Sequence, residues 1–172
     1  MVKRTGKIPD GIIKEYYNKK GKLLNEITYK DGKREGILRQ YWESGELKRE
    51  LTYKDDKLNG IRKEYWRGKL SSEVTYKNGK LEGIYKSYYE SGKLKQEGTY
   101  KNGKREGVWK QYWENGKLRG KETYKNDKLN GVAKDYSENG KLEQEVTYKN
   151  DWAEGIRNFV LRKWEVKTRR NL

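Results

Sequence analysis

The chain has 172 residues, of which 31% are hydrophobic and 40% charged, and its formal net charge is +16. It contains no cysteine and no histidine, which excludes disulfides, thiol nucleophiles, the usual zinc sites and imidazole acid–base chemistry. Its 15 tyrosines and 6 tryptophans argue against disorder, so we expect a folded but thin protein. No stretch has the length of a membrane span or of a signal-peptide core, and we therefore expect a cytoplasmic protein.

A repeated unit dominates the chain after a short lead-in, residues 1–10. From residue 11 to residue 154, a unit of about 24 residues occurs six times, and each copy contains Thr-Tyr-Lys. The tyrosines of this triplet are Tyr29, Tyr53, Tyr76, Tyr100, Tyr124 and Tyr148. A glycine followed by Ile or Val recurs with the same period. Such repetition predicts a stacked array with an extended binding surface rather than a catalytic pocket.

Strand and turn signals alternate within each unit. In the second unit, residues 36–42 and 47–53 are β-rich runs, separated by a turn at 43–46 and followed by another at 54–57. Asn78-Gly79 and Asn102-Gly103 are the strongest candidates for two-residue hairpin turns, since both residue types tolerate positive φ. We predict an all-β fold: a continuous antiparallel meander of about 13 strands, built from β-hairpin repeats, in one twisted or coiled sheet.

The hairpin register assigns side chains to the two faces of the sheet. A two-residue turn centred on Ser44 and Gly45 would place Trp42 opposite Leu47 and gather the large apolar residues on one packed face. The aromatic residues at that strand position would join this core: Trp42, Trp66, Tyr89 and Trp113. The other face would pair basic residues with glutamates, as Arg39 with Glu50, Lys63 with Glu73, Lys86 with Glu97, and Lys134 with Glu145. In the fifth unit Lys110 would meet Lys121 instead.

The last segment, residues 155–172, begins as a repeat and then loses its turn signals. We expect a degenerate repeat and a basic C-terminal cap that hides the final edge strand, with a short helix as one form of that cap. Its basic residues include Arg162, Lys163, Lys167, Arg169 and Arg170. The whole chain would form a single repeat domain.

Lysines flank one set of turns and form a candidate binding edge. They are Lys30, Lys33, Lys54, Lys57, Lys77, Lys80, Lys101, Lys104, Lys125, Lys128 and Lys149. If alternate turns project from one side of the sheet, these lysines form a basic edge with a step of two strands, roughly 10 Å. Such an edge attracts an acidic protein, a nucleic-acid backbone or an anionic membrane, or it serves only to keep an open sheet soluble.

Tyrosines on the face opposite the packed one form a candidate contact surface. They are Tyr16, Tyr41, Tyr65, Tyr88, Tyr112 and Tyr136. A ladder of exposed tyrosines is adhesive for proteins and can also stack on sugars.

Catalytic chemistry has no support in the sequence. The recurring glutamates mostly face a Lys or Arg, which neutralises them rather than separating two carboxyl pKa values as a paired-carboxylate mechanism requires. Neither a phosphate loop nor a calcium loop is present. We therefore predict that the protein is not an enzyme and that it has no catalytic residue, metal or cofactor.

The repeated pattern resembles a known family. Gly-Ile-x-Lys-x-Tyr-Trp-Glu-x-Gly-Lys-Leu, followed by Glu-x-Thr-Tyr-Lys-Asn-Gly-Lys, is similar over residues 11–156 to the MORN-repeat variant, a bacterial set that includes YwqK-type antitoxins. The resemblance implies an antitoxin- or immunity-like inhibitor, or a scaffold, that binds a protein partner such as a toxin or other effector. From the basic edge, the alternative is binding of RNA or single-stranded nucleic acid, including inhibition of a nucleic-acid-guided complex. Carbohydrate or surface adhesion is a third alternative, and membrane binding is not expected.

Overall fold

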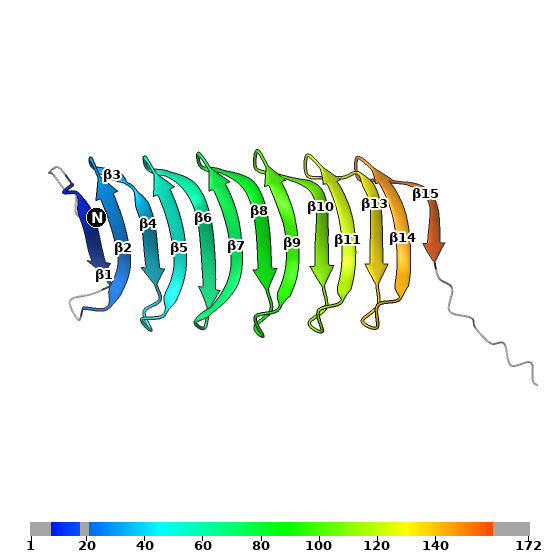
Figure 1. The fold of residues 1–172 in the computed structure, drawn as a ribbon, viewed down its shortest axis with the longest axis horizontal. Coiled ribbons are helices and arrows are strands. Elements are labelled where there is room, and N and C mark those ends of the chain that lie inside the picture. Colours follow the sequence, from blue (N-terminus) through cyan, green and yellow to red (C-terminus); the bar gives the residue numbers. More distant parts are fainter. Residues whose placement is uncertain (1–7, 18–20, 160–172) are drawn as a thin grey trace, which may run out of the picture.

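The computed structural model describes residues 8–17 and 21–159, and all regular elements in those ranges are β-strands of one antiparallel sheet (Figure 1). The strands are β1 (Gly11–Tyr16), β2 (Leu23–Lys30), β3 (Lys33–Arg34), β4 (Gly36–Tyr41), β5 (Leu47–Lys54), β6 (Lys57–Trp66), β7 (Lys69–Lys77), β8 (Lys80–Tyr88), β9 (Leu94–Lys101), β10 (Lys104–Tyr112), β11 (Leu118–Lys125), β12 (Lys128–Leu129), β13 (Gly131–Tyr136), β14 (Leu142–Lys149) and β15 (Trp152–Phe159). The all-β prediction is confirmed.

The topology is a meander in chain order. Thirteen of the described strands follow one another from β1 to β15, while β3 pairs with β2 and β12 with β11. Single residues, Glu35 and Asn130, separate β3 from β4 and β12 from β13, so each of these pairs occupies one strand position. The predicted number of about 13 strands is therefore confirmed. Since β1 and β15 lie at opposite ends, the sheet stays open and does not curl onto itself (Figure 1).

The turns alternate between two edges of the sheet. One edge, which we call the lysine edge, carries two-residue turns between paired lysines such as Lys77 and Lys80. Asn78 and Gly79 have φ of 50° and 80°, the left-handed conformation that a hairpin turn of this length requires. This prediction from the sequence is correct.

The opposite edge, which we call the aromatic edge, has a different geometry from the one predicted. The Trp42 N–H donates to the carbonyl of Glu46 at 2.8 Å, so the loop has three residues, and Tyr41 rather than Trp42 lies opposite Leu47. A bulge at the next position, between Gln40 and Tyr41, restores the predicted register for the rest of the hairpin. The loop and the bulge each shift the pairing by one residue, and the two shifts cancel.

The third unit, which is one residue shorter, has a shorter turn at the aromatic edge. There a two-residue turn, Arg67 and Gly68, joins Trp66 directly to Lys69. The missing residue is therefore removed from the loop and not from a strand.

A second kind of bulge explains the recurring glycine. Between repeats, Leu51 pairs with Arg62 and Tyr53 with Leu58, so Thr52 alone lies opposite residues 59–61. Gly60 has φ of 131°, and a Cβ there would lie 2.9 Å from the Thr52 Cβ. Only glycine combines this backbone conformation with this close approach.

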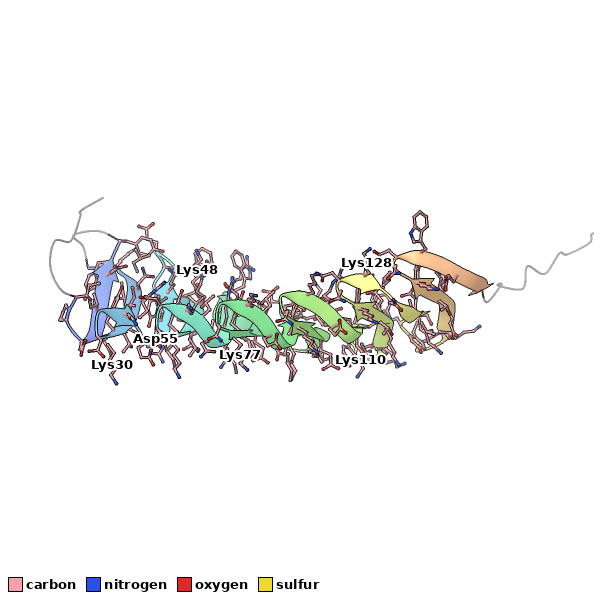
Figure 2. All side chains as sticks on the ribbon, turned by 90° about the horizontal axis from the view of Figure 1, so that it is seen from above. Lys30, Lys48, Asp55, Lys77, Lys110 and Lys128 are labelled. Carbon is pink, nitrogen blue, oxygen red and sulfur yellow. The ribbon has the colours of Figure 1, made fainter. Side chains whose placement is uncertain are left out.

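The two faces of the sheet differ in packing. The inner face carries the small core: Ile27, Leu38 and Leu51 are between 6% and 8% exposed, and Tyr29, Tyr53 and Leu58 pack against them. A second cluster, farther along the chain, surrounds Trp109, which is 3% exposed. The opposite face is the outer one. In Figure 2, Lys110 of the outer face is labelled below the sheet, as are Lys30 and Lys77, whereas Lys48 is labelled above it. The protein is thin, as expected.

Candidate functional site

The lysine edge brings together all eleven lysines predicted for it. Each is exposed, and ion pairs are seen only for Lys33 with Asp55 at 3.2 Å and Lys149 with Glu154 at 3.8 Å. The other nine of the eleven form no ion pair within the described part of the chain. Their charge is therefore available to a partner of opposite sign.

Backbone hydrogen bonds link successive turns of this edge. From the turn at residues 55–56 onward, the second residue of each turn donates its N–H to the carbonyl of a strand residue just after the preceding turn, and the N···O distances run from 2.7 to 3.1 Å. The donors are Asp56, Gly79, Gly103, Asp127 and Asp151, and the acceptors are Arg34, Leu58, Leu81, Arg105 and Leu129. These bonds hold the lysine pairs at a fixed spacing, which sequence reasoning did not detect.

The aspartates of the lysine edge have a structural role that the sequence analysis did not predict. The Asp56 carboxylate accepts hydrogen bonds from the backbone N–H of Arg34 at 3.0 Å and from its Nε at 2.9 Å, and these bonds lower the pKa of that carboxyl. Asp127 binds Arg105 in the same way. The guanidinium of Arg34 also lies 4.2 Å from the centre of the Tyr53 ring. These aspartates tie one turn to the next.

The predicted contact tyrosines form a row on the outer face, which we call the tyrosine row, but most are not free. Their hydroxyls donate to glutamates of the preceding repeat: Tyr41 to Glu26 at 2.8 Å, Tyr65 to Glu50 at 3.1 Å, Tyr88 to Glu73 at 2.7 Å and Tyr112 to Glu97 at 2.7 Å. Tyr16, at 51% exposed, is the most open of the six. Tyr136 lies beside the strand position where Lys121 replaces the glutamate, and no carboxylate binds its hydroxyl among the described residues. The row therefore presents ordered rings rather than free hydroxyls.

Burial and these contacts shift the pKa values of Tyr88, Tyr112 and Glu97. Burial, followed by the Glu73 carboxylate, raises the pKa of Tyr88 to about 12, and burial with Glu97 does the same for Tyr112. The hydrogen bond from Tyr112 lowers the pKa of Glu97, with a further contribution from Lys110. The raised pKa values keep Tyr88 and Tyr112 neutral at pH 7, and the lowered pKa keeps Glu97 ionised.

Between the tyrosine row and the lysine edge runs a row of alternating charge, as the register predicted. Arg39 pairs with Glu50 at 3.0 Å and Lys134 with Glu145 at 2.8 Å. Lys110 lies opposite Lys121 and turns to Glu97 on its other side, at 3.3 Å. Exposed pairs of this kind contribute below about 1 kcal/mol each, so they set register more than stability.

A further row, the β-branched row, borders the lysine edge and was not predicted as a surface. Ile or Val of each repeat alternates with the Thr that precedes its Tyr-Lys pair, because these residues face each other across the strands. The aliphatic members are 36% to 68% exposed: Ile12, Ile37, Ile61, Ile84, Val108 and Val132. The recurring Gly-Ile and Gly-Val pairs were the signal for this row.

The aromatic edge corrects the prediction that its residues belong to the core. Trp66 is 56% exposed, and the ring of Trp42 packs edge-on against it, with Lys48 4.0 Å from the Trp42 ring centre. Here too neighbouring repeats are linked, since Trp113 Nε1 donates to the Tyr136 carbonyl at 3.0 Å. Trp42 and Trp113 each stand at the start of a three-residue loop, whereas Trp66 precedes the two-residue turn of the third unit.

On the inner face, hydrogen-bonding side chains form a row directly beside the core, which we call the polar row. Its members are consecutive cross-strand neighbours: Glu15, Asn25, Gln40, Arg49, Glu64, Ser72, Ser87, Gln96, Gln111, Gly120, Asp135 and Gln144. No lysine occurs in this row, and its one arginine, Arg49, lies 3.8 Å from the Glu64 carboxylate.

The structure does not describe the predicted basic C-terminal residues. The basic residues Arg162, Lys163, Lys167, Arg169 and Arg170 lie outside the described residues. Within residues 8–17 and 21–159, no cluster of acidic side chains is suited to hold a metal ion. In that same part of the chain, no helix has the length and apolarity that crossing a membrane requires.

Together, an open sheet of hairpin repeats with ordered side-chain rows defines the class of repeat binding modules. The family model described as MORN repeat variant matches six segments: residues 9–31, 34–55, 58–78, 81–102, 105–126 and 129–150. The chain belongs to this family.

The remaining comparisons add little. No curated protein matches the chain. Among solved structures, it is similar to S. aureus TarM, crystallised as a mutant in complex with fondaparinux, α-GlcNAc-glycerol and UDP, with 11% sequence identity and a TM-score of 0.40. The match covers 70% of this chain and 21% of TarM. A likeness of that size carries no argument about function.

Proposed function

We propose that this protein is a non-catalytic binding module that acts by stoichiometric protein–protein interaction, as an antitoxin- or immunity-like inhibitor or as a scaffold. The observation that supports this best is the β-branched row on the outer face. One aliphatic side chain per repeat stays open to solvent there, directly beside the lysine edge. A continuous exposed apolar strip with a charged border is typical of a surface that a partner covers.

The length of the row supports a protein-sized partner. It crosses twelve strands, from Ile12 on β1 to Thr147 on β14. At a strand spacing of about 4.8 Å this is about 50 Å, long enough to contribute the roughly 800 Å² per partner of a standard interface. Since nine edge lysines are not ion-paired in the described structure, an acidic partner would associate fastest.

The tyrosine row supports the same proposal. Because Glu50 and Glu73 hold the hydroxyls of Tyr65 and Tyr88, these rings are ordered before a partner arrives. Pre-ordered aromatic side chains lose little conformational entropy on binding. The same contacts argue against catalysis, since both carboxylates are occupied as hydrogen-bond acceptors.

A differential capture experiment tests the proposal. The immobilised protein is exposed to nuclease-treated lysate of its source cells, in parallel with a double Ile61→Asp, Ile84→Asp variant of the outer face. Gln96→Ala, on the inner face, is the matched control. We expect one stoichiometric protein partner that the wild type and Gln96→Ala retain and the double variant loses. Equal capture by all three proteins, or no stoichiometric partner, would contradict the proposal.

The lysine edge favours a second candidate, the binding of RNA or single-stranded DNA. Pairs of lysines repeat every two strands and are held in register by the linked turns, and within the described residues all of the paired lysines except Lys33 lack an ion-pair partner. A salt titration with a mixed-sequence RNA and DNA pool separates the two functions. Sub-micromolar binding at about 0.15 M salt, lost on changing Lys54, Lys77 and Lys101 to Glu, would favour nucleic acid. Binding that vanishes by that salt concentration would leave the protein partner.

A further inference from the structure

A hollow of about 230 Å³ interrupts the packing of the inner face. On successive strands, the row of core residues runs from Leu38 through Leu51 to Arg62. Val74 follows on the next strand, and the aromatic cluster begins one strand later, with Tyr85. Arginine stands where the first two repeats have aliphatic side chains. The two halves of the core therefore leave an open gap between them.

The wall of this hollow is a preformed aromatic platform. The ring of Tyr85 stacks on Trp109, with centroids 5.5 Å apart and an interplanar angle of 26°. Trp109 lies over Gly98, where a Cβ would come within 2.1 Å of its ring, so glycine is required for this stacking. Besides this contact with Trp109, Tyr85 lines the hollow.

The polar groups of the hollow are balanced in charge. Arg62 Nε donates to Glu64 at 2.7 Å, and its Nη1 donates to the Tyr76 hydroxyl at 3.4 Å. Ser72 adds a hydroxyl, and no lysine lines the hollow. An anion would meet the carboxylate and a cation would meet the guanidinium, so neither finds an unopposed charge.

The polar row extends this site along the inner face. Ser72 pairs with Ser87, Ser87 with Gln96, and Gln96 with Gln111, each on the next strand. Gln96 and Gln111 line a second hollow of about 110 Å³, whose other lining residues are Tyr89, Lys95, Tyr112 and Arg119. Hydroxyl and amide groups therefore connect the two hollows without a cation between them.

We propose that the inner face binds an uncharged oligosaccharide, with one pyranose ring in the hollow against Tyr85 and its neighbours along the polar row. A flat aromatic ring suits the C–H face of a sugar. Planar guanidinium and carboxylate groups, with serine and glutamine, supply donors and acceptors in the plane of its hydroxyls. A phosphate in the first hollow would meet one lining cation, Arg62, which is already bound to Glu64. The site goes beyond the proposed protein interaction, which uses the opposite face.

Calorimetric titration of the full chain with cellohexaose, maltohexaose and hexa-N-acetylchitohexaose tests this proposal. At least one should bind, and its affinity should change less than about twofold between 0.15 and 0.5 M salt, because no net charge is neutralised. Tyr85→Leu and the near-isosteric Glu64→Gln should each weaken binding by about tenfold or more. Tyr88→Leu, three residues along the same strand but on the outer face, should leave it unchanged.

Circular dichroism of each variant separates loss of the site from loss of the fold, and Glu64→Gln keeps the shape of the side chain. Absence of binding by all three sugars at about 10 mM, a concentration above most single-site dissociation constants, would overturn the proposal. So would binding that survives both Tyr85→Leu and Glu64→Gln. Binding of an RNA dodecamer, in place of sugar, that depends on Glu64 would also overturn it.

Discussion

The two faces of the sheet use the same strands but differ in how strictly they repeat. On the outer face, the β-branched row, the charged row and the tyrosine row recur in nearly every unit. On the inner face, equivalent positions hold Leu38, Arg62, Tyr85 and Trp109, which differ in size and polarity. A surface that repeats suits an extended partner, whereas a face that varies from unit to unit creates one local site. The repeating surface and the local site thus lie on opposite faces of the same sheet.

Replacement of Trp109 by alanine should show the largest difference between the faces. Trp109 is buried among Tyr85, Tyr100 and Tyr124, so we expect a loss of about 3–5 kcal/mol in the free energy of unfolding. Its neighbour Val108 points to the outer face, and Val108→Ala should cost below about 1 kcal/mol. Urea denaturation of both variants measures this. Equal losses would mean that the outer row is also a core.

Substitution of a repeat glycine should have the next largest effect. In Gly60→Ala, the new Cβ meets Thr52 and the residue must keep a φ of 131°, so we expect a loss of about 2–4 kcal/mol. Gly79→Ala is the control, since Gly79 has φ of 80° but no atom near its Cβ position, and strain alone should cost about 1–2 kcal/mol. Denaturation midpoints compare the two. A milder effect at Gly60 than at Gly79 would refute the close contact with Thr52.

The architecture could be predicted because every unit repeats the same local signals. Asn78 and Gly79 mark a turn, and in the second unit alternation from the turn at Ser44 and Gly45 assigns Leu51 to the inner face and Glu50 to the outer face. Errors began where geometry depends on two compensating shifts. Neither the three-residue loop after Trp42 nor the bulge beside Tyr41 has a distinct residue type, so their joint effect on Trp42 and Leu47 was not visible.

The candidate sites were predicted unequally. The lysine edge follows directly from the position of lysines beside turns, but the bonds that link Gly79 to Leu58 join residues far apart in sequence. The inner hollow depends on departures from the repeat, at Arg62 and Gly98, rather than on the repeat itself. Comparing each unit with its neighbours, position by position, would have found both departures.

Alkaline titration should show that tyrosines on both faces of the sheet have raised pKa values. The pKa values of Tyr88 and Tyr112 on the outer face and of Tyr124 on the inner face are all raised to about 12, by burial first and then by a glutamate. Because unfolded tyrosine has a pKa of about 10, the folded state favours the neutral form. The resulting stability is fully present below pH 10 and is lost as the pH rises from about 10 to about 12.

Ultraviolet absorbance of tyrosinate, followed together with circular dichroism, measures this titration. We expect some tyrosines to ionise only as the sheet unfolds, whereas in denaturant all should titrate near pH 10. Ionisation of every tyrosine near pH 10 in a sheet that stays folded would show that the glutamate contacts do not persist in solution.

The smallest expected effect concerns the position on the outer face where Lys121 replaces the glutamate of the preceding units. Tyr112→Phe removes the hydroxyl that donates to Glu97 at 2.7 Å, and we expect a loss of about 1 kcal/mol, since the bond to a charged acceptor is only half-buried. Tyr136→Phe removes a hydroxyl from the equivalent position in the next unit, where Lys121 replaces the glutamate, and should cost close to nothing. Both are measured by urea denaturation.

The comparison is internal, because the two tyrosines share their strand position and differ mainly in the charge of the group beside the hydroxyl. Lys121→Glu should extend the interaction to the sixth unit, and in that background Tyr136→Phe should become as costly as Tyr112→Phe. If Tyr136→Phe remains neutral after Lys121→Glu, the glutamate is not what holds these rings. The order of the outer face would then have to come from packing of the rings alone.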